Sequence, residues 1–392
     1  MRIKLQITAH ILRIFIDILS KILLCLPVKS IIALKIVCKQ WDSVISDSSF
    51  QKSVEKKCRL SYSGTFMPKS LCLTNRFKET EHNFLDKDAT SSVPLKTWVF
   101  GKSKEGIKIE QSCNGLLLCS SKIPTNCWGR AYYVYNPYTG KYKLIPRRCG
   151  FCSVASVRLA FDPSISPYYK VISLWSRRGG YQIDIYSSQT SSSKNCGEKI
   201  RLQAYVSSES GVYLNGSLNW MSSQGTLVYF EVDQEVIKHL AVTTYVIDGV
   251  RKRVCYFDVC RGHLQMIVQN NPGVGSCFDV LEMDTAYTGW DLKYRMDLES
   301  RLKVLYPDLV GDSLQCSVML YDEVDTEGEG SPKLLLLIKC PLLVFGVITY
   351  DINDMHFRRI HSLEQPCICM FPEMRGVPSL RLFHYTGRLA RV

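Results

Sequence analysis

The N-terminal sixth of the chain has apolar side chains at helical spacing. Five of them fall at steps of one, three and four residues and form one apolar stripe: Ile18, Leu19, Ile22, Leu23 and Leu26. Arg13, Asp17 and Lys21 follow one another at four-residue steps on a second, charged face. The pattern predicts a helix that ends at Pro27, because proline cannot continue a helix.

Two further short helices are predicted before residue 60. Ser30 is a suitable N-cap for one whose apolar positions recur at three- and four-residue steps, namely Ile31, Leu34, Cys38 and Trp41. Another is expected after Asp47, with Phe50 and Val54 on one face. Three helices this short cannot enclose much core. We therefore expect exposed apolar surface that a partner covers.

The periodicity changes to two from about residue 95 onward. Short runs rich in Val, Ile, Tyr and Phe alternate with turn residues, which predicts strands. Comparable turn points at Asn136, Asp162 and Ser187 lie about 25 residues apart, so two hairpins span about 50 residues. That is the scale of one propeller blade, and the region would hold about six. A pair of large β-sandwiches is the structural alternative. The polar stretch 74–92 is expected to be a linker or a long surface loop.

Composition and charge exclude several classes. The chain has 392 residues, of which 46% are hydrophobic, so a disordered or disulfide-stapled protein is excluded. Its formal net charge of +13 suggests a negatively charged partner such as a nucleic acid, a membrane surface or an acidic protein. Residues 1–60 carry eleven basic and four acidic side chains, a net +7, which leaves +6 for the other 332 residues. The basic character therefore belongs mostly to the predicted helices.

The cysteines and the apolar runs indicate the compartment. Seventeen cysteines without framework spacing favour a reducing environment. Charges interrupt the N-terminal segment, as in a chain without a secretory signal, and every apolar run is too short to span a membrane. We expect a soluble, intracellular protein in the cytoplasm, the nucleus or both.

Candidate chemistry is sparse. Cys149 and Cys152 have CxxC spacing but lack the helix N-terminus that redox chemistry needs, and the remaining cysteines do not complete a zinc site. Gly273-Val-Gly275 fits a hairpin turn better than a dinucleotide loop. Asn215-Gly216 is better explained as a turn than as a glycosylation site. The sequence predicts neither a catalytic residue nor a metal, and no cofactor.

Two regions resemble a known family. The run ILSKILLCLPVKSIIALKIVCKQW over residues 18–41 closely resembles the plant F-box. Motifs of the later region are similar to the F-box-associated β-propeller: SCNGLLLC at 112–119, YVYNPYT at 133–139, LAFDP at 159–163, IYSS at 185–188 and RGHL at 261–264. The resemblance implies an α+β multidomain protein, with a small three-helix F-box followed by an all-β propeller of about six blades. The implied domains are an extension at 1–13, the F-box at 14–60, a linker with a first irregular segment at 61–94 and the propeller at 95–392.

The same resemblance implies a role. Members of this family serve as substrate receptors of cullin-based ubiquitin ligases, in which the F-box docks on a Skp-type adaptor and the propeller selects the target protein. Carried over by position, the adaptor-binding residues are Ile18, Leu19, Ile22, Leu23, Leu26, Pro27 and Val28, with Val37, Cys38 and Trp41 completing the packing. The target-binding residues are not predicted. This chain has Ile14-Phe15 where the family usually has Leu-Pro, and Lys21 where it usually has an acid.

Two other functions are compatible with the sequence. The chain could be a propeller hydrolase or lyase, if carboxylates near strand ends converge with a histidine; the candidates are Asp162, Asp184, Asp233, Asp258 and Asp351. It could also bind nucleic acid through the basic helices, although lysine outnumbers arginine there and no aromatic stacking series accompanies it.

Overall fold

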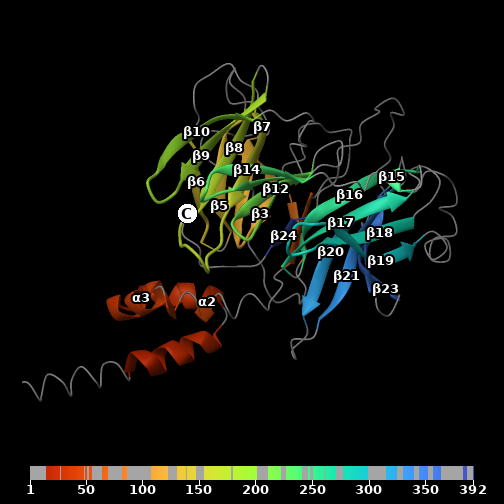
Figure 1. The fold of residues 1–392 in the computed structure, drawn as a ribbon. Coiled ribbons are helices and arrows are strands. Elements are labelled where there is room, and N and C mark those ends of the chain that lie inside the picture. Colours follow the sequence, from red (N-terminus) through yellow and green to blue (C-terminus); the bar gives the residue numbers. More distant parts are fainter. Residues whose placement is uncertain are drawn as a thin grey trace, which may run out of the picture.

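The chain folds into an N-terminal helical module and a series of antiparallel sheets (Figure 1). The computed structural model describes residues 15–26, 28–47, 49–50, 53–54, 64–68, 82–85, 107–121, 130–137, 139–146, 154–177, 180–200, 211–221, 227–240, 246–247, 250–260, 262–270, 277–298, 315–324, 330–339, 344–351, 356–362, 383–385 and 392. Within these ranges, side chains are not described for 28–29, 32, 64–85, 177, 197–200, 246–253 and 315–385.

The helical module begins with a helix over residues 15–25. It is followed by α2 (Val28–Ala33), the 3-10 turn η1 (Leu34–Ile36) and α3 (Lys39–Ser46). Residues 49–50 and 53–54 are again helical. The Asp47 carboxylate accepts the N–H groups of Ser49 at 2.8 Å and Phe50 at 3.3 Å, which is N-cap geometry. The predicted start of a helix after Asp47 is confirmed.

The second predicted helix is wrong in its extent. Ser30 lies inside α2 and does not cap it, and the helix does not continue to Trp41. Cys38 is extended (φ −163°, ψ 165°) and its carbonyl accepts the N–H of Asp42 at 3.1 Å, so it starts α3 as a new element. The extended backbone of Cys38 separates the two elements, because such a residue cannot continue the hydrogen-bond pattern of a helix.

The described strands form six sheets. One of three strands joins distant parts of the chain in the order β2-β1-β24, with β1 (Gly64–Pro68), β2 (His82–Leu85) and β24 (Phe383–Tyr385). The next two sheets have four strands each: β3 (Ile107–Cys113), β4 (Leu116–Ser121), β5 (Tyr132–Asn136) and β6 (Lys141–Leu144), then β7 (Val154–Ala160), β8 (Lys170–Arg177), β9 (Gly180–Ser187) and β10 (Ser192–Ile200).

The other three sheets continue in chain order. The fourth comprises β11 (Val212–Leu214), β12 (Ser217–Met221), β13 (Leu227–Glu231) and β14 (Val236–Leu240). The fifth has five strands: β15 (Val246–Ile247), β16 (Val250–Cys260), β17 (His263–Asn270), β18 (Cys277–Met283) and β19 (Trp290–Asp297). The last comprises β20 (Gln315–Val324), β21 (Gly330–Lys339), β22 (Val344–Asp351) and β23 (His356–Ser362).

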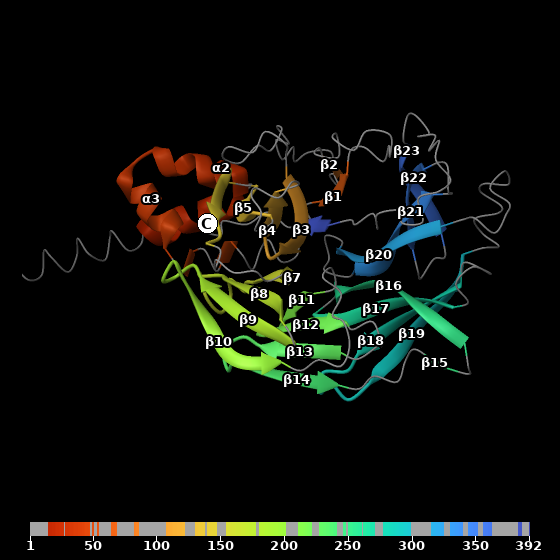
Figure 2. The ribbon, with the colours of Figure 1, turned by 90° about the horizontal axis from the view of Figure 1, so that it is seen from above.

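The sheets are arranged in a propeller-like manner (Figure 2). Neighbouring sheets meet mainly through their inner strands. β24 lies beside β3, β3 beside β7, β7 beside β11 and β12, β11 beside β16, and β16 beside β20. β1 and β2 fall within residues 61–94, where we expected a linker, and their pairing with β24 brings early and late parts of the chain into one sheet.

Apolar side chains fill the space between adjacent sheets. Val134, Leu159 and Val171 belong to one cluster between the β3–β6 and β7–β10 sheets, and Trp220 and Phe230 belong to the next one. A buried amide ties two sheets together: Gln111 Nε2 donates to the Leu159 carbonyl at 3.0 Å, and its Oε1 accepts the Leu159 N–H at 2.7 Å. The period-two pattern thus corresponds to strands with a buried face, as predicted.

The turns between strands follow their sequence signals. Asn215 and Gly216, between β11 and β12, have φ of 47° and 79°, and Asn114 and Gly115 have φ of 48° and 87°. Positive φ at both central positions is what a tight Asn-Gly hairpin requires. The interpretation of Asn215-Gly216 as a turn is confirmed. Within the described ranges, we find no helix that is both long and apolar enough to cross a membrane.

Candidate functional site

The helical module has a small core of its own. Seven buried side chains form it: Leu19, Leu23, Ile31, Val44, Ile45, Phe50 and Val54. Leu23 and Ile45 are completely buried, at 0% exposure. The half-buried Leu26 and Trp41 pack against this core. The core is therefore made by the inner side of each short helix and holds the module together.

A second apolar stripe on the first helix faces solvent. Phe15, Ile18 and Ile22 are 49%, 53% and 56% exposed. Cys25, the next position in this three- and four-residue series, is exposed as well. At the junction of η1 and α3, Ile36 is 89% and Val37 56% exposed. Since water-exposed side chains of this size gain by burial, these residues are the candidate docking surface.

The predicted adaptor-binding residues are divided by the structure. Ile18, Ile22, Val37 and Cys38 are exposed, whereas Leu19 and Leu23 are buried in the core. Val28 begins α2, but its side chain lies outside the described residues, as does Pro27 entirely. Val37 and Cys38, which were expected to complete the packing with the adaptor, are thus accessible to a partner, and Trp41 is half-buried.

Three exposed members of the surface are not among the predicted residues, namely Phe15, Cys25 and Ile36. Phe15 lies three residues before Ile18 and seven before Ile22, so the helical period could have identified it. Ile36 could not be identified in this way, because its exposure results from the break between η1 and α3. The apolar positions on the first helix form two adjacent stripes, one of which faces inward.

The charges of the module differ in their surroundings. Lys35 donates to Ser46 Oγ at 2.9 Å and lies 3.9 Å from the Asp42 carboxylate, so it is held within the module. Lys21 is exposed on the first helix, beside Ile22 in sequence. A docking partner would therefore meet apolar side chains with a basic group next to them.

The carboxylates considered for a propeller enzyme have structural contacts. Asp162 accepts the Ser164 N–H at 2.9 Å and Asp258 the Val259 N–H at 2.8 Å, while Asp233 pairs with Lys170 at 2.7 Å. Asp184 is buried and accepts Asn195 Nδ2 at 2.6 Å. The side chain of Asp351 lies outside the described residues. Within the described part of the chain, His, Cys, Asp and Glu form no group of three or more that could hold a metal.

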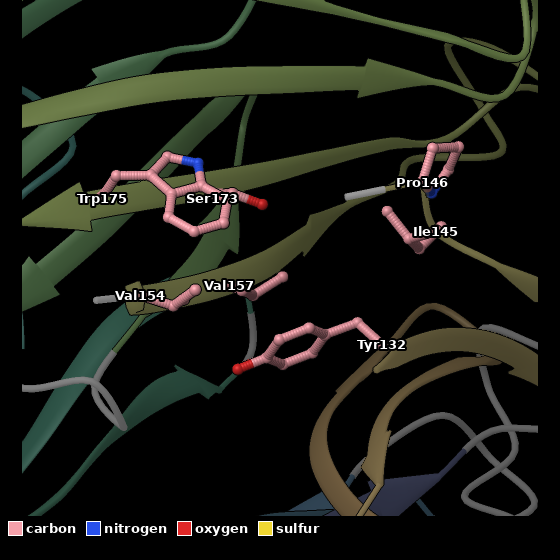
Figure 3. Close-up of a pocket in the computed structure, with 7 residues that line it drawn as sticks. All are labelled: Tyr132, Ile145, Pro146, Val154, Val157, Ser173 and Trp175. Carbon is pink, nitrogen blue, oxygen red and sulfur yellow. The ribbon is translucent and has the colours of Figure 1, made fainter. Parts of the chain in front are cut away.

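A small cavity lies between two sheets (Figure 3). Its walls include Tyr132 of β5, Val157 of β7, and Ser173 and Trp175 of β8, and it encloses about 20 Å³. That is the size of about one water molecule, whereas sites for small organic ligands are an order of magnitude larger. The cavity is a packing feature between sheets and cannot accept an organic substrate.

Cysteine labelling should reflect the two environments. Cys119 is buried, and burial raises the pKa of its thiol well above the usual range, so its reactive thiolate is suppressed. Cys25 and Cys38 are exposed. We expect iodoacetamide to modify Cys25 and Cys38 of the native protein within minutes and Cys119 only after denaturation, as measured by peptide mass spectrometry. Early labelling of Cys119 would contradict its burial. Cys149 and Cys152 lie outside the described residues.

Comparison with known proteins gives concordant results. The family model described as "F-box domain" matches residues 11–53, and the one described as "F-box associated beta propeller domain" matches residues 70–270. F-box protein At5g07610 of Arabidopsis thaliana is 30% identical over 405 residues, covering 96% of this chain and 92% of that protein. F-box/kelch-repeat protein At3g23880 of the same plant is 24% identical over 284 residues, covering 63% and 72%.

Solved structures resemble the chain more distantly. An oligogalacturonate lyase in complex with manganese matches with a TM-score of 0.42 and 9% identity, over 76% of this chain and 74% of that one. TolB from Acinetobacter baumannii matches with a TM-score of 0.36 and 10% identity, over 73% and 66%. The family models and the full-length relative carry the assignment. The chain belongs to the F-box proteins that have an F-box associated β-propeller domain.

Proposed function

We propose that this protein is the substrate-recognition subunit of an SCF-type (Skp–cullin–F-box) E3 ubiquitin ligase. Its F-box docks on a Skp-type adaptor and through it on a cullin, and its propeller binds the protein to be ubiquitinated. It is not itself an enzyme and needs no cofactor, since the transfer chemistry belongs to partner subunits. It acts in the cytoplasm, the nucleus or both.

The observation that carries this proposal is the exposed apolar stripe of Phe15, Ile18 and Ile22 on a module that already has a closed core. Lone exposed apolar residues are common, but a stripe at helical spacing on a small module indicates an interface. We propose that the adaptor covers this stripe together with Ile36 and Val37. Leu19 and Leu23 then act by packing the first helix against the core of the module, whereas Ile18 and Ile22 contact the adaptor.

We also propose the domain limits and the blade count. The F-box spans residues 14–60, and each of the six sheets is one blade. The pairing of β1 and β2 with β24 supports placing these early strands in the propeller, as the part that closes the ring. Residues 61–63 then separate the F-box from the first propeller strand in the sequence.

Replacement of Ile22 by Asp tests the adaptor contact. A carboxylate at a position covered by an apolar partner is desolvated without compensation, so we expect at least about thirtyfold weaker binding of a purified Skp-type adaptor. Biolayer interferometry with the full-length protein measures this. Ser43→Asp on α3 is the matched control, since it adds the same charge at an exposed position of the same module. Equal binding by wild type and Ile22→Asp, with both folded, would refute the proposed docking surface.

A further inference from the structure

The outer edge of one blade differs from the others. β6 is the outermost strand of the β3–β6 sheet, and all four of its side chains are exposed. Two of them are large apolar groups, Tyr142 at 45% and Leu144 at 51% exposure. They alternate with Lys141 and Lys143, so one side of the strand is apolar and the other is basic.

The lysines of β6 lack the ion pairs that the other described outer strands have. Lys194 of β10 pairs with Glu235, and Lys238 of β14 lies 2.6 Å from Glu231. On β19, Lys293 and Arg295 pair with Glu282 at 3.0 Å and Asp279 at 2.9 Å.

By contrast, Lys141 and Lys143 form no ion pair with any described residue, and residues 139–146 contain no acid. Two positive charges are therefore available to a partner at this edge.

The backbone of β6 also presents an edge. The Ile145 N–H donates to the Tyr132 carbonyl at 2.9 Å. These two residues lie opposite each other, since the preceding pair in the register is Tyr133 with Leu144. Hydrogen-bonded pairs alternate along an antiparallel ladder, so Lys143 also faces β5, and the N–H and C=O of Leu144 point to the outer edge. A further strand could pair there.

We propose that β6 binds an extended segment of the target protein by adding it to the β3–β6 sheet as a fifth strand. Residues directly opposite each other share a face of the sheet, so the segment would place acidic side chains against Lys141 and Lys143 and apolar ones against Tyr142 and Leu144. The partner chemistry is thus an alternating acidic and apolar peptide. This inference rests on the proposed function, in which the propeller presents the target.

Two other occupants fit less well. A second copy of β6 would bring lysine against lysine on the basic side, and like charges directly opposite are unfavourable. A nucleic acid could satisfy the lysines, but its phosphates are acceptors only and cannot match both the N–H and the C=O of an open strand edge. An acidic and apolar peptide can pair with the two lysines and also with the N–H and C=O groups of the open edge.

The test uses fluorescence anisotropy with the full-length protein and a fluorescein-labelled octapeptide of alternating Glu and Val. Lys141→Glu/Lys143→Glu is expected to weaken binding at least about tenfold. Leu144→Pro removes the outward N–H together with the exposed leucine side chain, and it should weaken binding to a similar extent while β5 pairing remains. Lys21→Glu/Lys39→Glu, which changes the net charge equally on the helical module, should leave peptide binding unchanged.

A second measurement keeps the test independent of variant folding. Two peptides, N-methylated at alternate amides, are compared with the wild-type protein. The one methylated at the amides that face β6 should lose binding and the other should retain it. Four outcomes would each overturn the proposal. They are equal binding of the two methylated peptides, wild-type peptide affinity of Leu144→Pro, complete displacement of the peptide by a dT20 oligonucleotide, and concentration-dependent dimerisation through β6. Adaptor capture by the β6 variants should equal wild type. Failure of capture by wild type would instead refute the proposed function.

Discussion

Leu23→Ala is expected to lower the free energy of unfolding of the helical module by about 2–5 kcal/mol, the cost of deleting a fully buried leucine side chain. Leu23 is 0% exposed and packs in the seven-residue core with Leu19 and Val44. Because this core is so small, each member supplies a large share of its burial. The module should open locally far more often in the variant.

The neighbouring residue is the matched control for this effect. Ile22 is 56% exposed, and Ile22→Ala should change stability by less than about 0.5 kcal/mol. Hydrogen–deuterium exchange of the full-length proteins measures both, read from peptides that cover residues 15–47. We expect accelerated exchange for Leu23→Ala and wild-type exchange for Ile22→Ala. Similar protection in the two variants would contradict the division of the helix into an inner and an outer stripe.

Gly211→Ala is expected to destabilise the propeller by about 1–3 kcal/mol, the usual cost of overpacking a core. Gly211 is buried just before β11, and a Cβ there would lie 2.5 Å from Cγ of Arg158 and 2.6 Å from Nε1 of Trp220. Both neighbours are only 1% exposed, so neither side chain has solvent to move into. The Arg158 guanidinium is further held by its hydrogen bond to the Val157 carbonyl at 2.9 Å.

Gly289→Ala is the control for Gly211→Ala. Nothing lies within 4 Å of a Cβ at Gly289, and its backbone is not in the left-handed region, so alanine should be tolerated there. Urea unfolding followed by tryptophan fluorescence compares the two variants at equal protein concentration. A midpoint for Gly211→Ala equal to wild type would mean that the contact of β7 with β11 is looser than the structure indicates.

Local periodicity was sufficient to predict the helices and where some of them begin and end. The three- and four-residue spacing of apolar side chains identified the first helix. Asp47 identified the start of the last helical segment, because capping involves only residues close in sequence. The break at Cys38 could not be predicted from its neighbours, since Leu34, Cys38 and Trp41 also fit one continuous helical face.

The same distinction holds for the sheets. Alternation and Asn-Gly pairs predicted strands and hairpins such as the turn at Asn215, because both depend on a few adjacent residues. The pairing of Gly64 with Tyr385 joins positions more than 300 residues apart, and no local pattern encodes the partner of a short strand. The steric limit at Gly211 likewise depends on side chains that come from other strands.

For the candidate sites, the sequence by itself determined that residues 18–41 form a short helical module with more apolar side chains than it can bury, and that its relatives are F-box proteins. Only the tertiary structure decided which of these side chains face inward. Leu19 and Leu23 face inward, whereas Ile18 and Ile22 do not. Exposure depends on what packs against each face of a helix, so periodicity alone cannot distinguish a core stripe from a docking stripe beside it. The open edge at β6 was also decided there, since Lys194 of β10 finds its acid, Glu235, in the β13–β14 turn of the next sheet, whereas Lys141 and Lys143 pair with no described acid.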